Sequence, residues 1–201
     1  MITVADQGDM RIITINRAEK ANALTRDMLL DLHAAFDAPS ARAVVLTGQG
    51  AVFSAGADLD AARAGLTTDQ VWEALSSRIA ALPCLTIAAL NGTLAGGAFG
   101  MALACDIRLA VAGAKFFYPV MRLGYLPQPS DPARLSALIG PARAKMILLG
   151  GAKIDAGEAL AWGLIDRIVP EGGLMEAAKA LAMDAHAASP EHVSAIKAMI
   201  P

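Results

Sequence analysis

The sequence has few aromatic residues and no run of charge of one sign. Aromatic side chains make up 4% of the 201 residues and hydrophobic ones 55%, so the core must consist mainly of alanine, leucine, isoleucine and valine. The net charge is −2, and the lysines and arginines are not clustered. This composition argues against nucleic acid or an anionic membrane as the main partner.

The chain also has few cysteines and no long hydrophobic run. Cys84 and Cys105 lie in apolar surroundings without the spacing of metal ligands, so we expect no metal site and a reducing, cytoplasmic location. The first residues do not join a basic region to a long apolar one, so no secretory signal is predicted. The longest apolar stretches are interrupted by proline, asparagine and glycine, and none is predicted to span a membrane.

Apolar runs typical of buried strands alternate with apolar residues at helical spacing. Strands are expected at residues 10–16, 43–47, 52–54, 85–90 and 107–111. Helices are expected at residues 24–36, 68–81, 97–105, 133–139, 142–149, 156–162 and 174–187. This order predicts an α/β fold with right-handed connections, and a chain of 201 residues predicts a single domain.

Small residues occupy two strand-to-helix turns, FSAGADL at 53–59 and NGTLAGGA at 91–98. The first N–H groups of a helix have no partner within it and lie at the positive end of its dipole. Two such ends facing one point would stabilise a developing oxyanion, such as the enolate of a thioester. The alternative is tight packing between strand and helix, which also favours glycine and alanine.

Six segments follow one another in an order that is typical of one enzyme family. They are Asn16-Arg17 with Asn22-Ala23-Leu24, and the segments 43–48, 53–59, 91–97, 105–108 and 156–165. In these segments the chain resembles the crotonase superfamily, also called the enoyl-CoA hydratase/isomerase family, over about residues 13–170. The resemblance implies a crotonase-like spiral of ββα units with outer helices, assembly as a homotrimer or hexamer, and acyl-CoA thioesters as substrates.

By position, the resemblance assigns an oxyanion hole to the backbone N–H groups of Ala57 and Gly97. Coenzyme A would arrive as part of the substrate and not as a permanently bound cofactor. The residues that would line its path are Lys20, Ala21, Ala55, Asp58 and Leu59. For Asp58 the competing interpretation is capping of a helix, and for Lys20 it is a solvated surface charge.

The chain departs from the family pattern where proton transfer is expected. Hydratases of the family use two glutamates as base and acid, and the matching positions here hold Gly100 and Val120. Gln128 stands where other isomerases and dehalogenases place an aspartate, and an amide is not a general base. Asp131 is the nearest remaining carboxylate and the candidate catalytic base. Because it precedes Pro132 at a predicted helix start, capping of that helix is the competing interpretation.

These features predict an acyl-CoA thioester enzyme, a lyase or isomerase of fatty acid metabolism that works without the usual glutamates. Tyr118 or Tyr125 could protonate an enolate, although packing with a satisfied hydroxyl is the simpler role for both. The alternative function is a non-catalytic acyl-CoA-binding or structural protein of the same fold. Residues 171–201 resemble the start of the family's C-terminal helices, so we expect a shortened helical segment after a core of about residues 1–170, and a more open site.

Overall fold

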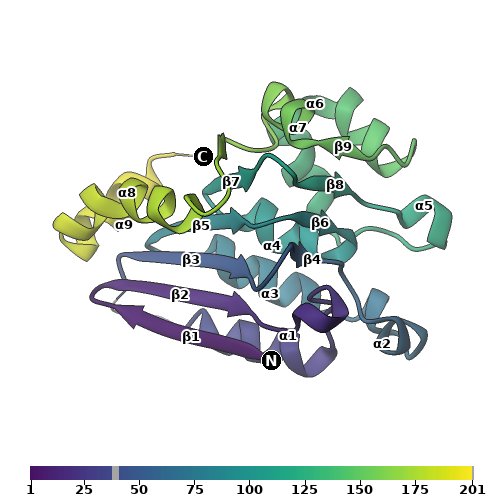
Figure 1. Cartoon of the computed structure of the whole chain (residues 1–201), viewed down its shortest axis with the longest axis horizontal. Coiled ribbons are helices and arrows are strands. Elements are labelled where there is room, and N and C mark those ends of the chain that lie inside the picture. Colours follow the sequence, from purple (N-terminus) through teal and green to yellow (C-terminus); the bar gives the residue numbers. More distant parts are fainter. Residues whose placement is uncertain (38–40, 201) are drawn as a thin grey trace.

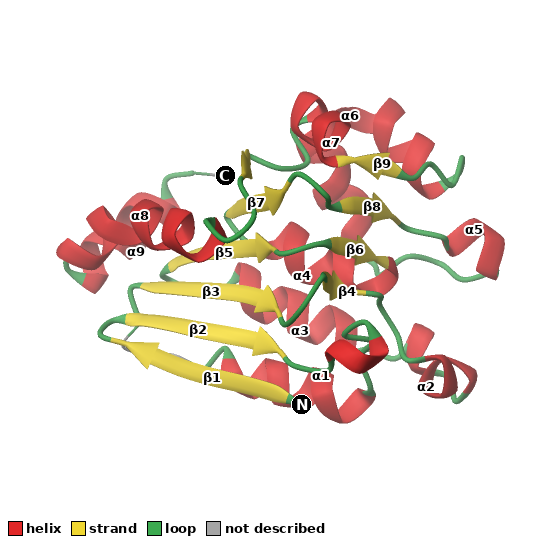
Figure 2. Ribbon diagram, viewed as in Figure 1, coloured by secondary structure: helices red, strands yellow, loops and turns green. Residues whose placement is uncertain are grey.

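The strands form two sheets, and from β3 onward successive strand pairs place one strand in each (Figures 1 and 2). The computed structural model describes residues 1–37 and 41–200. The larger sheet has the order β1 (Ile2–Gln7), β2 (Met10–Ile15), β3 (Ala43–Gly48), β5 (Leu85–Leu90), β7 (Ile107–Val111) and β10 (Arg167–Val169). The smaller sheet has the order β4 (Val52–Ser54), β6 (Thr93–Ala95), β8 (Lys115–Phe117) and β9 (Ile154–Asp155). Neighbouring strands are parallel except in the pairs β1–β2 and β8–β9.

Helices follow the strand pairs and cover both faces of the larger sheet. They are α1 (Arg26–Ala35), α2 (Leu59–Arg63), α3 (Val71–Ala80), α4 (Phe99–Ala104), α5 (Val120–Leu123), α6 (Asp131–Leu148), α7 (Ala156–Trp162), α8 (Leu174–Ala187) and α9 (Pro190–Ala198). In Figure 1, α1, α3 and α4 lie behind the larger sheet, and α8 lies in front of it, packed on β3, β5 and β7. The expected α/β spiral of ββα units with outer helices is therefore confirmed.

The predicted strands match the observed ones to within one residue, and the helices differ mainly at their ends. Helix α1 begins at Arg26 because the hydroxyl of Thr25 accepts the N–H of Met28 and caps the helix. The helices predicted at 133–139 and 142–149 are joined into α6, whose backbone leaves helical geometry at Gly140 (φ 79°, ψ 159°). Strand β1 was not predicted because all its residues after Ile2 are exposed. The other strands and α-helices for which no residue range was predicted are the short strands β6, β8, β9 and β10 and the helices α2, α5 and α9.

The core consists of aliphatic side chains around a few aromatic ones. Phe36, Phe53, Phe99 and Phe116 are fully buried, and every residue of β3 is buried. Both cysteines are buried free thiols. In the described parts of the chain, no helix is long and apolar enough to cross a membrane.

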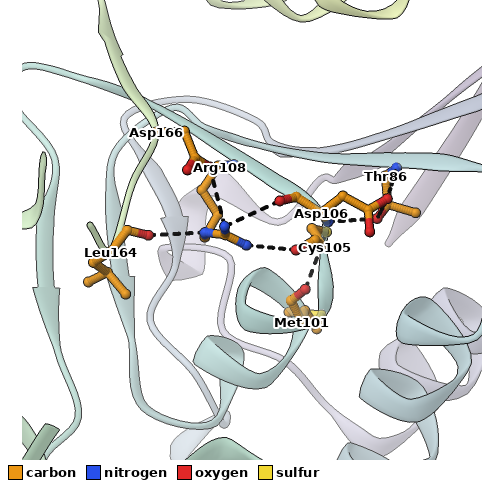
Figure 3. Close-up of polar contacts among 7 residues, drawn as sticks. All are labelled: Thr86, Met101, Cys105, Asp106, Arg108, Leu164 and Asp166. Atoms are coloured by element: carbon orange, nitrogen blue, oxygen red, sulfur yellow. Dashed lines mark hydrogen bonds and ion pairs between the residues drawn. The ribbon is translucent and has the colours of Figure 1, made fainter. Parts of the chain in front are cut away.

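A buried arginine ties β7 to the segment that leads into β10 (Figure 3). The guanidinium of Arg108, which is 4% exposed, donates to the carbonyl oxygens of Cys105 (2.6 Å) and Leu164 (3.0 Å). It also pairs with the carboxylate of Asp166 at 3.3 Å, and Asp166 accepts the backbone N–H of Arg108 at 2.7 Å. Since a buried guanidinium is tolerated only when its donors are satisfied, these contacts fix the two segments together.

The neighbouring aspartate links the same region to β5 and to the C-terminal helix. Asp106 accepts the backbone N–H and the hydroxyl of Thr86 at 2.8 and 2.9 Å. The ammonium group of Lys197 in α9 donates to the same carboxylate at 2.7 Å. The segment 105–108, which contributed to the family resemblance, therefore supports the sheet rather than the reaction.

Replacing Arg108 with methionine should destabilise the protein by about 3–5 kcal/mol, because it leaves the carboxylate and carbonyl oxygens without their buried donor. Urea unfolding of Arg108→Met and of the parent protein measures this. The control is Arg63→Met, whose exposed side chain pairs only with the exposed Asp60; its effect should stay within about 0.5 kcal/mol. Equal effects of the two substitutions would contradict the structural role of Arg108.

Candidate active site

The first glycine-rich turn leaves β4 and enters α2 beside the segment that precedes α1. The N–H of Leu24 donates to the carbonyl oxygen of Gly56, and the N–H of Asp58 donates to that of Leu24, both at 2.8 Å. Because this parallel bridge uses the groups of residues 56 and 58, the N–H of Ala57 between them points away from Leu24. Gly56 has φ of +88°, a conformation that side chains rarely adopt.

Buried polar side chains hold this turn in place. Asn22 is 0% exposed, and its side-chain amide donates to the carbonyl oxygen of Val52 at 2.7 Å. The hydroxyl of Ser54 donates to the carbonyl oxygen of Asn22 at 2.8 Å and accepts the N–H of Gly56 at 3.2 Å. The segment before α1 and the segment after β4 therefore form one frame, which explains why both belong to the pattern shared with the family.

Asp58 caps α2 and pairs with an arginine. Its carboxylate accepts the guanidinium of Arg17 at 2.8 Å, and it accepts the N–H groups of Asp60 and Ala61 at 3.0 and 3.3 Å. The hydrogen bond from Arg17, together with those from the helix N–H groups, lowers the pKa of Asp58. The carboxylate is thus engaged within the protein, as the capping interpretation expects.

The second turn joins β5, β6 and α4. The side chain of Asn91 accepts the N–H of Gly48 at 3.0 Å and donates to the carbonyl oxygen of Gly50 at 2.7 Å. A Cβ at Gly92 would lie 1.9 Å from the carbonyl oxygen of Ala51, so no other residue fits this position. The turn ends in a short 3-10 helix, Gly96–Ala98, which leads directly into α4.

The two turns are in contact. A Cβ at Gly56 would lie 2.9 Å from the carbonyl oxygen of Ala95 and 3.4 Å from the amide nitrogen of Gly97. Gly97 belongs to the first turn of its helix, where N–H groups lack partners within the helix. Gly56 and Gly97 are some 40 residues apart in the sequence. Because neither has a side chain, the two main-chain segments can approach each other directly.

A cavity of about 290 Å³ lies where the turns meet, and both Ala57 and Gly97 line it. Other residues of its wall include Ala55, Leu59, Arg63, Trp72, Tyr118, Tyr125 and Gln128. The wall comes from the two turns, α2, α3 and the region around α5, so the cavity lies beyond the carboxyl ends of the parallel strands, toward the right of Figure 1. This edge is where α/β sheets usually bind small molecules.

The residues assigned to the coenzyme A path are only partly brought together. Ala55 and Leu59 line the cavity, and Leu59 is 75% exposed. Ala21 is connected to this turn because its carbonyl oxygen accepts the N–H of Ala55 at 3.0 Å. Lys20 is exposed at the end of the helix Ala18–Lys20, outside the cavity wall formed by the described residues.

Asp131 lies behind the cavity and not in its wall. It is the first residue of α6 and is 1% exposed. Its Oδ2 accepts the hydroxyl of Tyr118 at 2.9 Å, while its Oδ1 has no hydrogen-bond partner among the described residues. Neither oxygen caps the helix, so the competing interpretation from the sequence does not describe the contacts that this carboxyl makes.

Burial raises the pKa of Asp131 to about 7, against the hydrogen bond from Tyr118 and the positive charge of Arg134, which both lower it. The negative charge of Glu73 adds to the increase. Burial and the adjacent Asp131 raise the pKa of Tyr118 above its ordinary value. A carboxyl that titrates near neutrality is suited to exchanging protons at physiological pH.

A second carboxylate supports the start of α6. Glu73 on α3 accepts the N–H of Ser130 at 3.1 Å and also accepts its hydroxyl. Although burial acts in the opposite direction, the hydrogen bonds from Ser130 lower the pKa of Glu73. The ionised Glu73 therefore anchors the residue before Asp131, and the two carboxyls differ in charge over part of the neutral range.

The buried carboxyl of Asp131 occupies the space beside Gly100 on α4. A Cβ built on Gly100 would lie 2.8 Å from Asp131 Oδ1. Position 100 is where the family resemblance places the first glutamate, and a side chain there would require the carboxyl of Asp131 to shift. This contact could not be predicted from the sequence, because residues 100 and 131 belong to different helices.

Two other features lie apart from this site. A hollow of about 510 Å³ is lined by residues that include Phe117, Met121, Leu149 and Lys153, but not by Ala57 or Gly97. Among the described residues, no cluster of three or more histidine, cysteine, aspartate or glutamate side chains could hold a metal ion. The convergence of the glycine-rich turns therefore identifies the smaller cavity as the candidate active site.

Comparison with known proteins agrees with the geometry. Residues 6–200 match the sequence profile of the family described as enoyl-CoA hydratase/isomerase. A carnitinyl-CoA dehydratase from Citrobacter koseri is 35% identical over 94% of this chain and 76% of its own length.

Solved structures extend the likeness to three dimensions. DspI from Pseudomonas aeruginosa superposes with a TM-score of 0.91 at 34% identity, over 99% of this chain and 85% of that one. An enoyl-CoA hydratase from Bacillus anthracis superposes with a TM-score of 0.90 at 34% identity, over 99% of this chain and 81% of that one.

The raised pKa of Asp131 predicts that stability falls as pH rises. The folded protein keeps this proton up to about pH 7, whereas an unfolded aspartate loses it near pH 3.9, about 3 units lower. Between these values the native state binds more protons, so raising the pH weakens it by up to about 4 kcal/mol and has little further effect above.

Urea unfolding between pH 4 and 8 of the parent and of Asp131→Asn measures this contribution. The neutral amide keeps an acceptor for Tyr118 but cannot ionise, so the loss of stability with pH should be smaller in the variant by that amount. Other carboxylates contribute equally to both proteins, which makes the difference specific. Parallel pH profiles would contradict burial of an ionisable Asp131.

The contact between positions 100 and 131 predicts a change of sign in a double-mutant cycle. In the parent, Gly100→Ala places a methyl group 2.8 Å from Asp131 Oδ1 and should cost about 1–3 kcal/mol. In an Asp131→Ala background the same substitution should stabilise the protein by up to about 1 kcal/mol, because alanine favours a helix over glycine. Additive effects in urea unfolding would show that the two positions do not touch.

Proposed function

The chain belongs to the enoyl-CoA hydratase/isomerase family, a family of acyl-CoA enzymes, and on this basis we propose that it binds an acyl-CoA thioester and stabilises the enolate formed from it. The thioester carbonyl oxygen is placed between the N–H groups of Ala57 and Gly97. The observation that carries the proposal is the contact of the two glycine-rich turns at a cavity that both residues line.

Backbone donors suit this role because they are fixed before the reaction begins. The N–H of Ala57 points away from the bridge at Leu24, and the N–H of Gly97 lies at the start of a helix. Negative charge that develops on the carbonyl oxygen would meet donors that need no rearrangement. Each donor of this kind contributes about 3 kcal/mol to transition-state stabilisation.

The nucleotide end of the substrate is proposed to leave the cavity along α2. Ala55 and Leu59 line the cavity on that side, and Arg63 is the cation in its wall. The guanidinium of Arg63 pairs with Asp60 at 2.9 Å, and both side chains are exposed to solvent. Because an exposed ion pair is weak, a phosphate could replace Asp60 as the partner of Arg63. Lys20 and Ala21 extend the same path behind the turn, and Asp58 supports it by capping α2.

A second function is favoured by a specific observation. Positions 100 and 120, where the resemblance places the two glutamates, hold glycine and valine, which cannot transfer protons. A protein that binds acyl-CoA without converting it would keep the turns and lose these acids. The two functions share the same binding event and differ in whether the bound thioester exchanges a proton or gains water.

The proposed hydrogen bonds to the carbonyl can be tested with two ligands that differ only there. Butyryl-CoA should bind about five- to tenfold more tightly than S-butyl-CoA, the thioether without the carbonyl, because two hydrogen bonds are lost in the thioether. Isothermal titration measures both dissociation constants. Loss of crotonyl-CoA absorbance, measured in parallel, reports hydration.

Matched variants at Gly97 isolate its N–H group. Gly97→Pro removes the donor, whereas Gly97→Ala keeps it, and in both the new Cβ would lie 3.3 Å from the ring of Trp72. The preference for butyryl-CoA should largely disappear in the proline variant and persist in the alanine variant. Equal binding of the two ligands by the parent protein would refute the assigned oxyanion hole.

A further inference from the structure

We propose that Tyr118 and Asp131 form a proton relay, in which Tyr118 exchanges a proton with the α-carbon of the bound acyl-CoA and Asp131 stores the hydroxyl proton of Tyr118 behind the cavity wall. The inference rests on the proposed function, because it needs the thioester carbonyl at Ala57 and Gly97. It assigns the catalytic contact to a tyrosine and gives the aspartate a role that acts through it.

Tyr118 is the residue that connects the cavity to the buried carboxyl. Tyr118 lines the cavity together with Ala57 and Gly97. Its hydroxyl donates to Asp131 Oδ2 at 2.9 Å and accepts the backbone N–H of Gln128 at 3.4 Å. A hydroxyl oxygen can accept a second hydrogen bond, so one position on it remains for a proton from the substrate.

The ring of Tyr118 is held in a fixed orientation. It stacks on Phe99 with ring centroids 5.4 Å apart and an angle of 25° between the planes. Phe99 is fully buried at the start of α4, the helix that follows the second glycine-rich turn. The tyrosine therefore packs on α4, which directly follows the short helix that contains Gly97.

Asp131 is placed to store a proton but not to meet the substrate. It is 1% exposed and does not contribute to the cavity wall. Its Oδ1 has no partner among the described residues and lies against Gly100, which leaves room for the carboxyl only because position 100 has no side chain. A buried polar atom without a partner costs free energy, which is commonly a mark of a functional group.

Tyr118 could not act as a base or acid alone. Its pKa is raised by burial and by the adjacent Asp131, so a phenolate beside an ionised carboxylate is strongly disfavoured. Coupled transfer avoids this state, because the tyrosine gains one proton as it gives up another. Asp131 then changes charge, and its pKa of about 7 allows both of its forms near neutrality.

The relay balances in both directions. In enolate formation the Cα–H bond breaks, its proton goes to Tyr118 Oη, and the hydroxyl proton of Tyr118 passes to Asp131 Oδ2. The electron pair of the broken bond moves into the enolate, whose oxygen lies between the N–H groups of Ala57 and Gly97. In the reverse direction Asp131 returns its proton to Tyr118, and Tyr118 protonates the α-carbon.

Other charged groups set the proton affinity of Asp131. Glu73, on α3, raises its pKa through negative charge, and Arg134, on α6 itself, lowers it. Tyr118, which precedes α5, lowers it through the hydrogen bond. Because Glu73 is held by Ser130 and keeps a lowered pKa, it stays ionised while Asp131 titrates.

The test is exchange of the α-protons of butyryl-CoA in D₂O, followed by mass spectrometry, because a relay proton that equilibrates with solvent during the life of the enolate returns to the α-carbon as deuterium. Tyr118→Phe and Asp131→Asn should each slow the exchange by about 100-fold or more. The double variant should be no slower than either single one, since the two groups act as a unit. Asp184→Asn, an exposed change on α8, is the control for charge removal and should exchange at the parent rate.

The pH dependence separates a proton store from a structural support. The parent exchange rate should rise with pH to a plateau with a midpoint near 7, where Asp131 ionises. In Asp131→Asn this step should be absent, whereas butyryl-CoA should still raise the melting temperature, as any ligand that prefers the native state does. The retained thermal shift also shows that the variants are folded.

Each remaining outcome overturns a defined part of the argument. Exchange that survives both substitutions, or a pH step near 7 that persists in Asp131→Asn, refutes the relay. Binding of butyryl-CoA without any exchange in the parent refutes it too and favours the non-catalytic function. Absence of binding refutes the proposed function together with the relay that depends on it.

Discussion

The site depends on one shared acceptor, the carbonyl oxygen of Val52 at the start of β4. The side-chain amide of Asn22 donates to it at 2.7 Å and that of Asn91 donates to it at 3.3 Å. The first asparagine precedes α1 and the second precedes the turn into α4, so this single oxygen ties both sides of the cavity to β4. Both hydrogen bonds are partly buried, and they attach the two segments that flank the contact between Gly56 and Gly97 to the same strand.

The second constraint is that residue 100 on α4 and residue 131 on α6 share one space, which the side chain of residue 131 fills. Position 100 on α4 has no side chain, and the carboxyl of Asp131 on α6 lies in the space that one would occupy. An acid is therefore present next to α4 although α4 itself carries none. Restoring a glutamate at position 100 alone would bring a second carboxyl against the first, which adds both overlap and like charge. Any change of function at this point would have to alter both residues together.

Much of the fold could be predicted from the sequence, because it is encoded in local patterns. Buried parallel strands such as Ala43–Gly48 are continuous apolar runs. The glycine-rich turns indicate where two main-chain segments come into contact. Strand β1 could not be predicted, since its pairing with β2 comes from the backbone and its side chains stay in water. The sequence predicted Asp131 as the candidate base, with capping of a helix as the alternative, but it did not predict the contacts that this carboxyl makes. A position before Pro132 suggests a helix cap, and only the packing of α6 on α4 shows the bond to Tyr118.

The chemical identity of residue 131 is the strongest argument that this buried cluster does more than support the fold. An asparagine would also accept the hydroxyl of Tyr118, and it would not lose stability as the pH rises from about 4 to about 7. The aspartate instead keeps an oxygen without a partner among the described residues and a pKa raised to about 7 by burial. Asp131 lowers the stability of the native state at neutral pH, and packing alone does not explain why such a group lies one hydrogen bond from the cavity. The proposed proton transfer would account for this cost, because a carboxyl with a pKa of about 7 can take up and release a proton near neutral pH, whereas an amide cannot.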